Sequence, residues 1–283
     1  MARIPGPSGD IPILVAHPDW KAPAPVVVWL HGRTAHKELD PGRYLRWIRA
    51  GMGACAMDLP AHGERSDVGR QDPSQSLDTI ARAAGEIDAV VTGLNDPAWS
   101  GMFDLGRLAI GGMSLGGMAA LLRLCEPHRF RAASVEGSAG WLEGLYVPGA
   151  LPVPEQGDGE GRVPVSGAPA THDPAAVRRV DPVAHLEGFV PIPLLVLHSE
   201  ADRIVPWLVQ RRFVERLRSH YRARGADESM IEVRTWASTG APLEHVGFGR
   251  FSNDAKNTQA EFLARALGVG RESIAGGRAG AEA

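Results

Sequence analysis

A single serine set between small residues is the feature that most constrains how this chain folds. Residues 108–122 read LAIGGMSLGGMAALL, in which Gly112, Ser114 and Gly116 form a G-x-S-x-G pattern. An apolar run precedes the serine, and a run with helical spacing follows it. The pattern is typical of a nucleophile elbow, a strand-to-helix turn so tight that bulky neighbours would collide with its backbone. A glycine-rich turn before a core helix is the alternative, so the rest of the chain must separate the two.

Short β-branched runs alternate with helical patterns along the chain. This alternation predicts crossover units and an α/β fold, with a doubly wound, mostly parallel sheet flanked by helices. The expected strands are 11–16 (an outer strand), 26–30, 54–57, 108–112, 132–135, 194–198 and 231–236, and the expected helices are 41–50, 76–94, 115–125, 207–221 and 253–267. In such a sheet the functional groups belong on loops at the carboxyl ends of the strands.

One domain, residues 1–268, is the expected organisation, because 283 residues can bury one large core. Residues 141–178, after the strand near 132–136, are rich in proline and glycine. An irregular insertion of this length is often a lid or binding loop, and a surface excursion is the alternative. The tail 269–283 is mostly glycine, alanine and charged residues and is expected to be disordered.

Composition argues against several classes of function. The formal net charge of −3 gives no electrostatic case for binding nucleic acid. No apolar stretch reaches 18 residues, so no membrane-spanning segment is expected. The amino terminus lacks the apolar centre of a secretory signal, and two cysteines are too few for a disulfide framework. We therefore expect a cytoplasmic protein, and the sequence leaves a monomer or a homodimer open.

A serine hydroxyl becomes a nucleophile when an imidazole removes its proton and a carboxylate orients that imidazole. Asp202 follows the strand 194–198, and His245 lies in the loop after the strand 231–236. Both residues therefore lie on loops downstream of Ser114, where a doubly wound sheet places functional groups.

Each of these residues also has a simpler interpretation. Asp202 could cap the helix that begins nearby, and His245 could be a surface histidine. Glu200 and Glu136 are alternative acids. His198 lies at the end of a central strand, where a structural role is favoured.

Acyl chemistry also needs two backbone amides aimed at the charge that develops on the attacked carbonyl. Leu115 follows the serine at a helix start, where unpaired donors and the helix dipole favour negative charge. The loop after the strand 26–30 reads HGRT, and we expect the Arg33 amide to be the second donor, with Thr34 as the alternative. The apolar residues expected to line a substrate pocket are Trp141, Leu142, Leu145, Tyr146, Trp207 and Phe248.

Four segments give the chain a resemblance to the α/β-hydrolase superfamily, and within it to esterases and dienelactone-hydrolase-like proteins. They are VWLHG at 28–32, DLPAHGERS at 58–66, GMSLG at 112–116, and HSEADRIVP at 198–206, followed later by His245. The resemblance covers about residues 10–268. It implies Ser114 as the nucleophile, His245 as general base and then acid, and Asp202 as the orienting carboxylate. It also implies that the protein uses no metal and no organic cofactor.

The resemblance has two departures. Residues 198–199 read His-Ser where many relatives have His-Gly, which leaves Asp202 in register. Residues 141–178 occupy the place where this superfamily inserts its variable lid, so the resemblance does not predict the substrate of this protein. The expected activity is hydrolysis of a small-molecule carboxylic ester with a small or medium acyl group, by an acyl-enzyme mechanism. A peptidase or acyltransferase using the same residues, and a non-catalytic small-molecule binding protein, are the alternatives.

Overall fold

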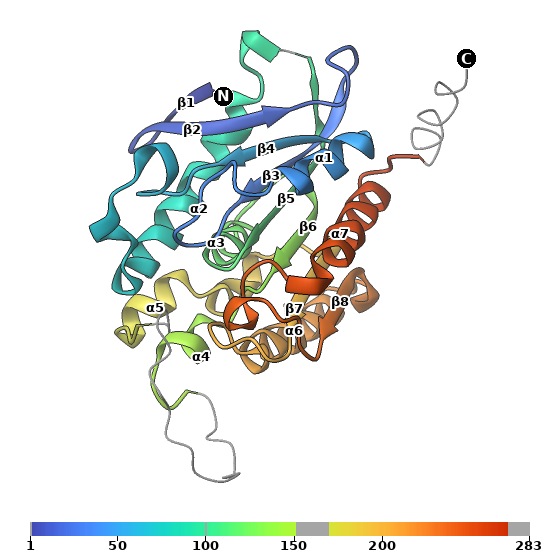
Figure 1. The fold of residues 1–283 in the computed structure, drawn as a ribbon. Helices are drawn as coiled ribbons and strands as arrows, with labels where there is room; N and C mark the ends of the chain where they lie inside the picture. Colours follow the sequence, from blue (N-terminus) through green and yellow to red (C-terminus); the bar gives the residue numbers. More distant parts are fainter. Residues whose placement is uncertain (1, 100, 151–169, 271–283) are drawn as a thin grey trace.

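The computed structural model describes residues 2–99, 101–150 and 170–270 (Figure 1). Within this part of the chain, eight strands form one sheet in the order β1-β2-β4-β3-β5-β6-β7-β8. The strands are β1 (Ala2–Gly6), β2 (Gly9–Ala16), β3 (Ala24–Leu30), β4 (Gly53–Met57), β5 (Phe103–Met113), β6 (Phe130–Glu136), β7 (Leu194–Ser199) and β8 (Ile231–Trp236). The helices are α1 (Pro41–Arg49), α2 (Ser76–Gly93), α3 (Leu115–Arg123), α4 (Leu142–Tyr146), α5 (Pro174–Val180), α6 (Trp207–Ala223) and α7 (Ser252–Ala266).

The sheet is parallel from β4 to β8, whereas β1 and β2 join it antiparallel at one edge. Every residue of β3 and β4 is buried, as expected for parallel strands covered on both faces. The predicted mostly parallel, doubly wound sheet is therefore confirmed. Expected and observed elements agree within a few residues over most of the chain, because their apolar periodicity follows the two faces of the sheet.

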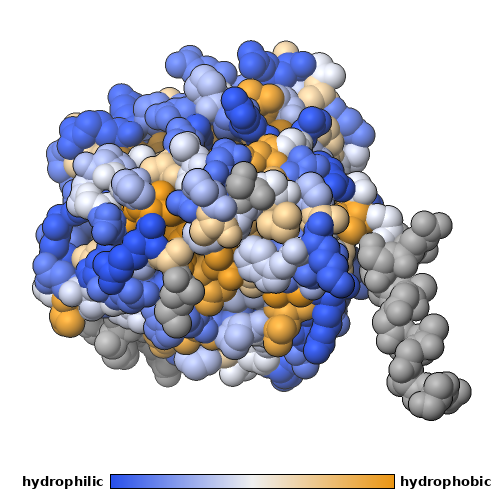
Figure 2. Space-filling model, turned by 90° about the horizontal axis from the view of Figure 1, so that it is seen from above, coloured by the Kyte–Doolittle hydropathy of each residue, from blue (hydrophilic) through white to orange (hydrophobic). Residues whose placement is uncertain are grey.

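Two apolar cores lie on opposite faces of the sheet. Val26 and Val28 belong to one core and Val27 and Trp29 to the other, since successive strand side chains point to opposite faces. Helices α2, α3 and α6 contribute to the first core, and α1 and α7 to the second. Figure 1 shows α1 and α7 together on one side of the sheet, with α2 and α3 on the other. The space-filling view from above shows apolar patches separated by hydrophilic residues (Figure 2).

Strand β1 was not expected, and the segment 11–16 is not the outermost strand. The sequence does not predict β1, because the segment contains Pro5 and Gly6, and proline and glycine are rare in strands. The structure accommodates Pro5 at the sheet edge, where a missing amide breaks no pairing with an outer neighbour. Ile4, which is buried, anchors the strand against α2: an added Cβ on Gly93 would lie 2.2 Å from its side chain.

Two short helices begin within residues 141–178, where the sequence predicted an irregular insertion. Helix α4 lies at its start, and α5 begins after Asp173, whose carboxylate accepts the Ala176 amide. Residues 151–169 of the expected lid and 271–283 of the expected disordered tail lie outside the described residues. The lid, the tail and the one-domain organisation therefore stay predictions. No helix in the described ranges combines the length and apolarity that crossing a membrane requires.

Candidate active site

Ser114 lies at the turn between β5 and α3, with φ 52° and ψ −120°. A residue with a side chain rarely adopts this conformation, which costs about 1–3 kcal/mol and must be held by its surroundings. A Cβ added to Gly112 would lie 2.5 Å from the Gly116 carbonyl carbon, and one added to Gly116 would lie 2.3 Å from the His31 oxygen. The turn therefore requires glycine at both positions. The tight strand-to-helix turn predicted from the G-x-S-x-G pattern is therefore present, and the nucleophilic role of Ser114 stays a prediction.

Backbone hydrogen bonds hold the strained serine in place. The Ser114 amide donates to the Glu136 carbonyl at 2.8 Å, so the elbow is fixed to the end of β6. The Ser114 carbonyl accepts the Ser138 hydroxyl and the Met118 amide, each at 3.0 Å. Since both backbone groups of Ser114 are bonded, the side chain has little freedom except to rotate about its own bond.

The three residues proposed from the sequence for proton transfer lie in one hydrogen-bonded chain. Asp202 Oδ2 lies 2.7 Å from His245 Nδ1, and His245 Nε2 lies 2.9 Å from Ser114 Oγ. With Nδ1–H donating to the carboxylate, Nε2 is free to accept the hydroxyl proton. The residues come from the loops after β5, β7 and β8, all at the carboxyl edge of the sheet.

Asp202 also organises its own loop. Its Oδ1 accepts the amides of Ile204 and Val205, both at 2.8 Å, while Oδ2 faces the imidazole. The capping alternative is wrong, because α6 has Pro206 at its N-cap and no side-chain cap, and the two amides that Asp202 accepts lie in the loop before the helix. The alternative acids bond elsewhere: Glu136 pairs with Arg43, and Glu200 accepts the Thr235 hydroxyl.

His198, the strand-end histidine, lies beside this carboxylate. Its Nε2 is 2.8 Å from the Val205 carbonyl and 3.6 Å from Asp202 Oδ2. Burial lowers the pKa of His198, so the ring is neutral around pH 7 and donates to Val205 from Nε2. The structural role favoured from the sequence agrees with these contacts.

The loop that carries His245 has two consecutive left-handed residues. Leu243 has φ 54° and Glu244 has φ 55°, conformations that residues with side chains rarely adopt. Strain of this kind persists only where the surrounding contacts over-determine the backbone. The two left-handed residues turn the backbone so that the next residue, His245, points towards Ser114.

The Glu244 carboxylate supplies those contacts, and sequence reasoning did not identify it. It accepts the Thr239 amide at 2.5 Å, the Thr239 hydroxyl at 2.8 Å, the Gly240 amide at 2.8 Å and the Ser199 hydroxyl at 2.9 Å. These bonds, led by that from the Thr239 amide, lower the pKa of Glu244 to about 2. Ser199 is the position where the sequence departs from the His-Gly of many relatives. The hydrogen bond from the Ser199 hydroxyl to Glu244 therefore connects the end of β7, next to the Asp202 loop, with the loop that carries His245.

The loop expected to supply the second amide passes directly beside the serine. A Cβ added to Gly32 would lie 3.5 Å from Ser114 Cβ, so this loop and the elbow are in contact. Leu115 is the first residue of α3, where helical geometry leaves the amide without an intrahelical acceptor. Both positions suit a pair of oxyanion donors, and the assignment of the Leu115 and Arg33 amides stays a prediction.

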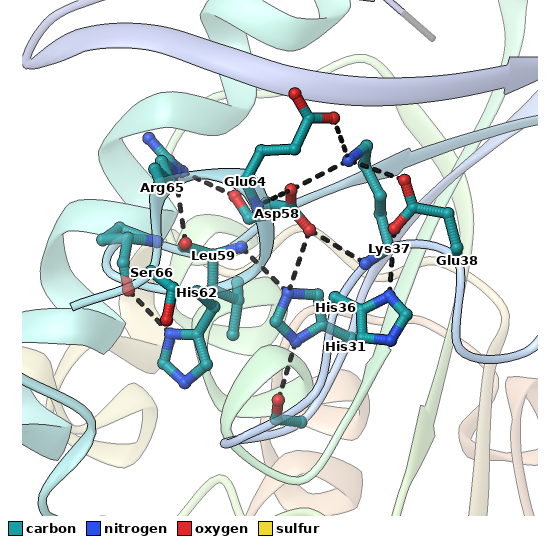
Figure 3. Close-up of polar contacts among 12 residues, drawn as sticks. His31, His36, Lys37, Glu38, Asp58, Leu59, His62, Glu64, Arg65 and Ser66 are labelled. Atoms are coloured by element: carbon teal, nitrogen blue, oxygen red, sulfur yellow. Dashed lines mark hydrogen bonds and ion pairs between the residues drawn. The ribbon is translucent and has the colours of Figure 1, made fainter. Parts of the chain in front are cut away.

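His31 holds this loop in shape (Figure 3). Its Nε2 accepts the Leu59 amide at 3.0 Å, so Nδ1 carries the hydrogen and donates to the Gly32 carbonyl at 2.7 Å. Burial lowers the pKa of His31 to about 4, which keeps the ring neutral in this arrangement. The histidine is therefore part of the support for the loop, not of the proton-transfer chain.

A buried lysine fastens the same loop to the end of β4. Lys37 has no exposed side-chain surface, and its ammonium contacts Asp58 at 2.9 Å, Glu64 at 2.6 Å and Glu38 at 2.7 Å (Figure 3). Burial disfavours its charge, but the hydrogen bonds to these carboxylates outweigh that effect and raise the pKa of Lys37. Asp58 also accepts the Lys37 amide at 2.9 Å, so its carboxylate contacts both the backbone and the side chain of this lysine.

The six residues expected to line a substrate pocket have varied surroundings. Trp141 lies under the Arg216 guanidinium, Tyr146 packs edge-on against His172, Trp207 packs against His198, and Phe248 packs against Trp236. Leu142 is fully buried, and Leu145 is partly buried against the same core. None of the six lines the cavity that borders the elbow loop, which has a volume of about 290 Å³. Their contact with substrate stays a prediction.

No group of three or more histidine, cysteine, aspartate or glutamate side chains in the described ranges is arranged to hold a metal ion. Cys55 and Cys125 are buried and unpaired, and burial raises the pKa of each thiol to about 12. Neither thiol is therefore ionised near neutral pH.

A strained serine at a strand-to-helix turn, bonded to an imidazole at the carboxyl edge of a mostly parallel sheet, defines a serine hydrolase of the α/β-hydrolase fold. The family model described as the prolyl oligopeptidase family matches residues 84–270, which is more than half of the sequence. The chain belongs to this family, and the predicted resemblance is confirmed.

Individual relatives are distant. Esterase YjfP of Escherichia coli (strain K12) is 29% identical over 203 residues, which cover 70% of this chain and 77% of that protein. TT1662 from Thermus thermophilus has a TM-score of 0.62 at 21% identity, covering 94% of this chain and 97% of that one. Pyrococcus horikoshii acylaminoacyl peptidase has a TM-score of 0.69 at 15% identity, covering 96% of this chain and 42% of that one. At these identities the two structural likenesses show the fold alone.

Proposed function

We propose that the protein hydrolyses small-molecule carboxylic esters through a covalent acyl-enzyme. Ser114 is the nucleophile, His245 is the general base and then the general acid, and Asp202 orients the imidazole. The observation that carries this proposal is the continuous chain of two hydrogen bonds from Asp202 through His245 to Ser114, at 2.7 and 2.9 Å. A binding protein would have no need for such a chain next to a strained serine.

The reaction proceeds in two halves. Ser114 Oγ attacks the ester carbonyl while His245 Nε2 takes the hydroxyl proton, and the resulting oxyanion is held by the Leu115 and Arg33 amides. The C–O bond to the alcohol then breaks, and the alcohol leaves with the proton from Nε2. Water repeats the sequence on the acyl-enzyme, releasing the carboxylic acid and restoring the serine.

Ester hydrolysis is favoured by the esterase relative, and a small or medium acyl group by the apolar residues around α4. Peptide hydrolysis is the second candidate, because the chain belongs to the prolyl oligopeptidase family and has the fold of an acylaminoacyl peptidase. The same machinery would serve, although an amine is a poorer leaving group than an alcohol. Acyl transfer to another acceptor, a cytoplasmic location and a monomeric or homodimeric state remain expectations.

The test compares Ser114→Ala with the exposed control Ser219→Ala on short activated esters, lactones and peptide amides. We expect Ser114→Ala to lose ester turnover and labelling by a fluorophosphonate probe, and Ser219→Ala to retain both. Folding of each variant is checked by circular dichroism and thermal unfolding. Ester turnover retained by a folded Ser114→Ala protein would reject the assignment. Turnover confined to peptide amides would favour the second candidate.

A further inference from the structure

A cavity of about 290 Å³ extends from the loop after β3, which lies beside the serine turn, towards α1 and α7. Gly32 and Met113 form the wall next to the serine, and Val246 and Gly247 form the wall that follows His245. Ser114 itself does not line the cavity, but Met113, the preceding residue, does, and a Cβ added to Gly32 would lie 3.5 Å from Ser114 Cβ. The cavity therefore adjoins the site where the ester bond would break.

Much of the cavity wall is apolar. Its apolar lining consists of Trp29, Ala35, Leu39, Tyr44, Met113 and Val246. Leu39 is 58% exposed and Val246 is 50% exposed, so both offer apolar surface that an occupant can cover. Covering such surface stabilises a bound group by roughly 25 cal/mol per Å² removed from water.

The charged groups of the wall are paired with one another. Arg43 contacts both oxygens of Glu136, at 2.5 and 2.7 Å, and Lys256 contacts Asp40 at 2.8 Å. Arg43 also contacts Asp40 at 3.1 Å. Two cations thus face two carboxylates, and the lining has no excess charge from these groups. A charged occupant would give up hydration without gaining an unpaired partner, so a neutral one is favoured.

The position relative to His245 decides which part of an ester the cavity receives. The imidazole must return its proton to the departing alcohol, so the alcohol lies on the side of the ester nearest His245. Val246 and Gly247, the two residues that follow His245 in the sequence, line the cavity. Trp141 and Tyr146, two of the residues predicted to line the substrate pocket, belong to the core on the opposite face of the sheet, whereas Phe248 belongs to the core on the cavity's face. The two parts of the substrate would therefore separate across the carboxyl edge of the sheet.

We propose that this cavity binds the alcohol portion of the ester, and that it takes a neutral apolar group. An apolar cavity of about 150 Å³ can hold benzene, so about 290 Å³ admits a bicyclic aromatic group or a chain of about six carbons. This assignment rests on the proposed ester hydrolysis and adds the chemistry of the leaving group to it.

The experiment varies one side of the ester at a time. Ethyl, butyl and hexyl acetate share one acyl group, and their alcohols have similar basicity, so differences in kcat/KM report binding of the alcohol. We expect kcat/KM to rise about two-fold per methylene, less than for complete burial because the mouth of the cavity is open. Ethyl acetate, ethyl butyrate and ethyl hexanoate form the matching acyl series.

Leu39→Ala and Val246→Ala should each lower the ratio of kcat/KM for hexyl over ethyl acetate by about 3- to 10-fold. Leu45→Ala is the matched control, because Leu45 is 49% exposed on α1 and does not line the cavity. The control should leave the ratio unchanged.

Two results would overturn the assignment while leaving ester hydrolysis intact. One is an unchanged hexyl-to-ethyl ratio in both folded cavity variants, and the other is a change confined to the acyl series. Absence of turnover on every ester in a folded wild-type protein would reject the proposed function and this assignment together. The two failures are therefore distinguishable.

Discussion

The buried ion pair between Arg43 and Glu136 gives a prediction whose size follows from its surroundings. Arg43 is 4% exposed and Glu136 is 1% exposed, and the guanidinium also lies 4.3 Å from the Trp29 ring centre. Arg43→Met would leave the carboxylate buried with a hydrogen bond from Gln259 at 3.1 Å as its remaining side-chain contact. Removing one partner of such a pair costs about 3–5 kcal/mol. That is a large share of the roughly 5–15 kcal/mol that stabilises a typical domain.

The double variant Arg43→Met/Glu136→Gln tests the physical reason for that loss. It leaves no buried charge, so we expect it to recover at least about 2 kcal/mol relative to Arg43→Met alone. The surface variant Arg211→Met is the control, because its pair with Glu215 is about half exposed and should contribute about 0–1 kcal/mol. The free energy of unfolding is measured by urea titration at pH 7.

Either of two results would refute the reasoning. Arg43→Met could destabilise the protein no more than Arg211→Met does, which would mean that burial does not strengthen the pair. Alternatively, the double variant could be less stable than Arg43→Met, which would mean that the lost stability comes from packing of the arginine and not from an unpaired carboxylate.

Three further predictions concern the supports of the site. The pKa of His31 is about 4 in the folded protein and about 6.5 in the unfolded chain, so the unfolded chain binds more protons between these pH values. The free energy of unfolding should therefore fall by up to about 3 kcal/mol as the pH drops through that range, and it should fall less in His31→Gln. Urea titration at pH 7 and pH 4.5 measures both changes. Glu244→Gln should lower kcat for ester hydrolysis about 10-fold with little change in KM, because it loosens the loop that positions His245; an unchanged kcat would show that the clamp is dispensable. Gly116→Ala should lower Tm sharply or prevent folding, since its Cβ would lie 2.3 Å from a backbone oxygen. Gly85→Ala is the control and should raise Tm, because a Cβ at this position inside α2 would meet nothing within 4 Å. Equal effects of the two substitutions on Tm would contradict the steric explanation.

The parts of the site that sequence predicted are those fixed by local pattern. Ser114 was found because the elbow needs small residues at defined spacings, and the structure shows the contacts that exclude larger ones. Asp202 and His245 were found because each follows a recognisable buried strand. Strand ends in a parallel sheet converge on one edge, so three residues distant in sequence could be placed together without coordinates.

The parts that sequence could not predict depend on contacts between loops. Glu244 has no motif of its own, and its role appears only when its carboxylate meets Ser199 and Thr239 from other loops. The cavity is assembled from β3, β5, β6, α1, α7 and two loops, so no single segment predicts it. Apolar character and closeness in sequence to an expected loop do not predict which face of the sheet a residue joins, so the six predicted pocket residues do not coincide with the lining of this cavity.

Three of the seven residues other than glycine that have positive φ in the described ranges lie where the proposed chemistry needs fixed geometry. Ser114, Leu243 and Glu244 each have positive φ, and all three lie within two residues of an atom in the proton-transfer chain. Hydrogen bonds from different strand ends restrain the two segments. The end of β6 holds Ser114, and residues at or after the ends of β7 and β8 hold the loop that carries His245. Because the elbow and the histidine loop are fixed independently to the same sheet, the distance from Ser114 to His245 depends on the rigidity of that sheet. The contacts in the loops can therefore position the reacting atoms without any contribution from α4.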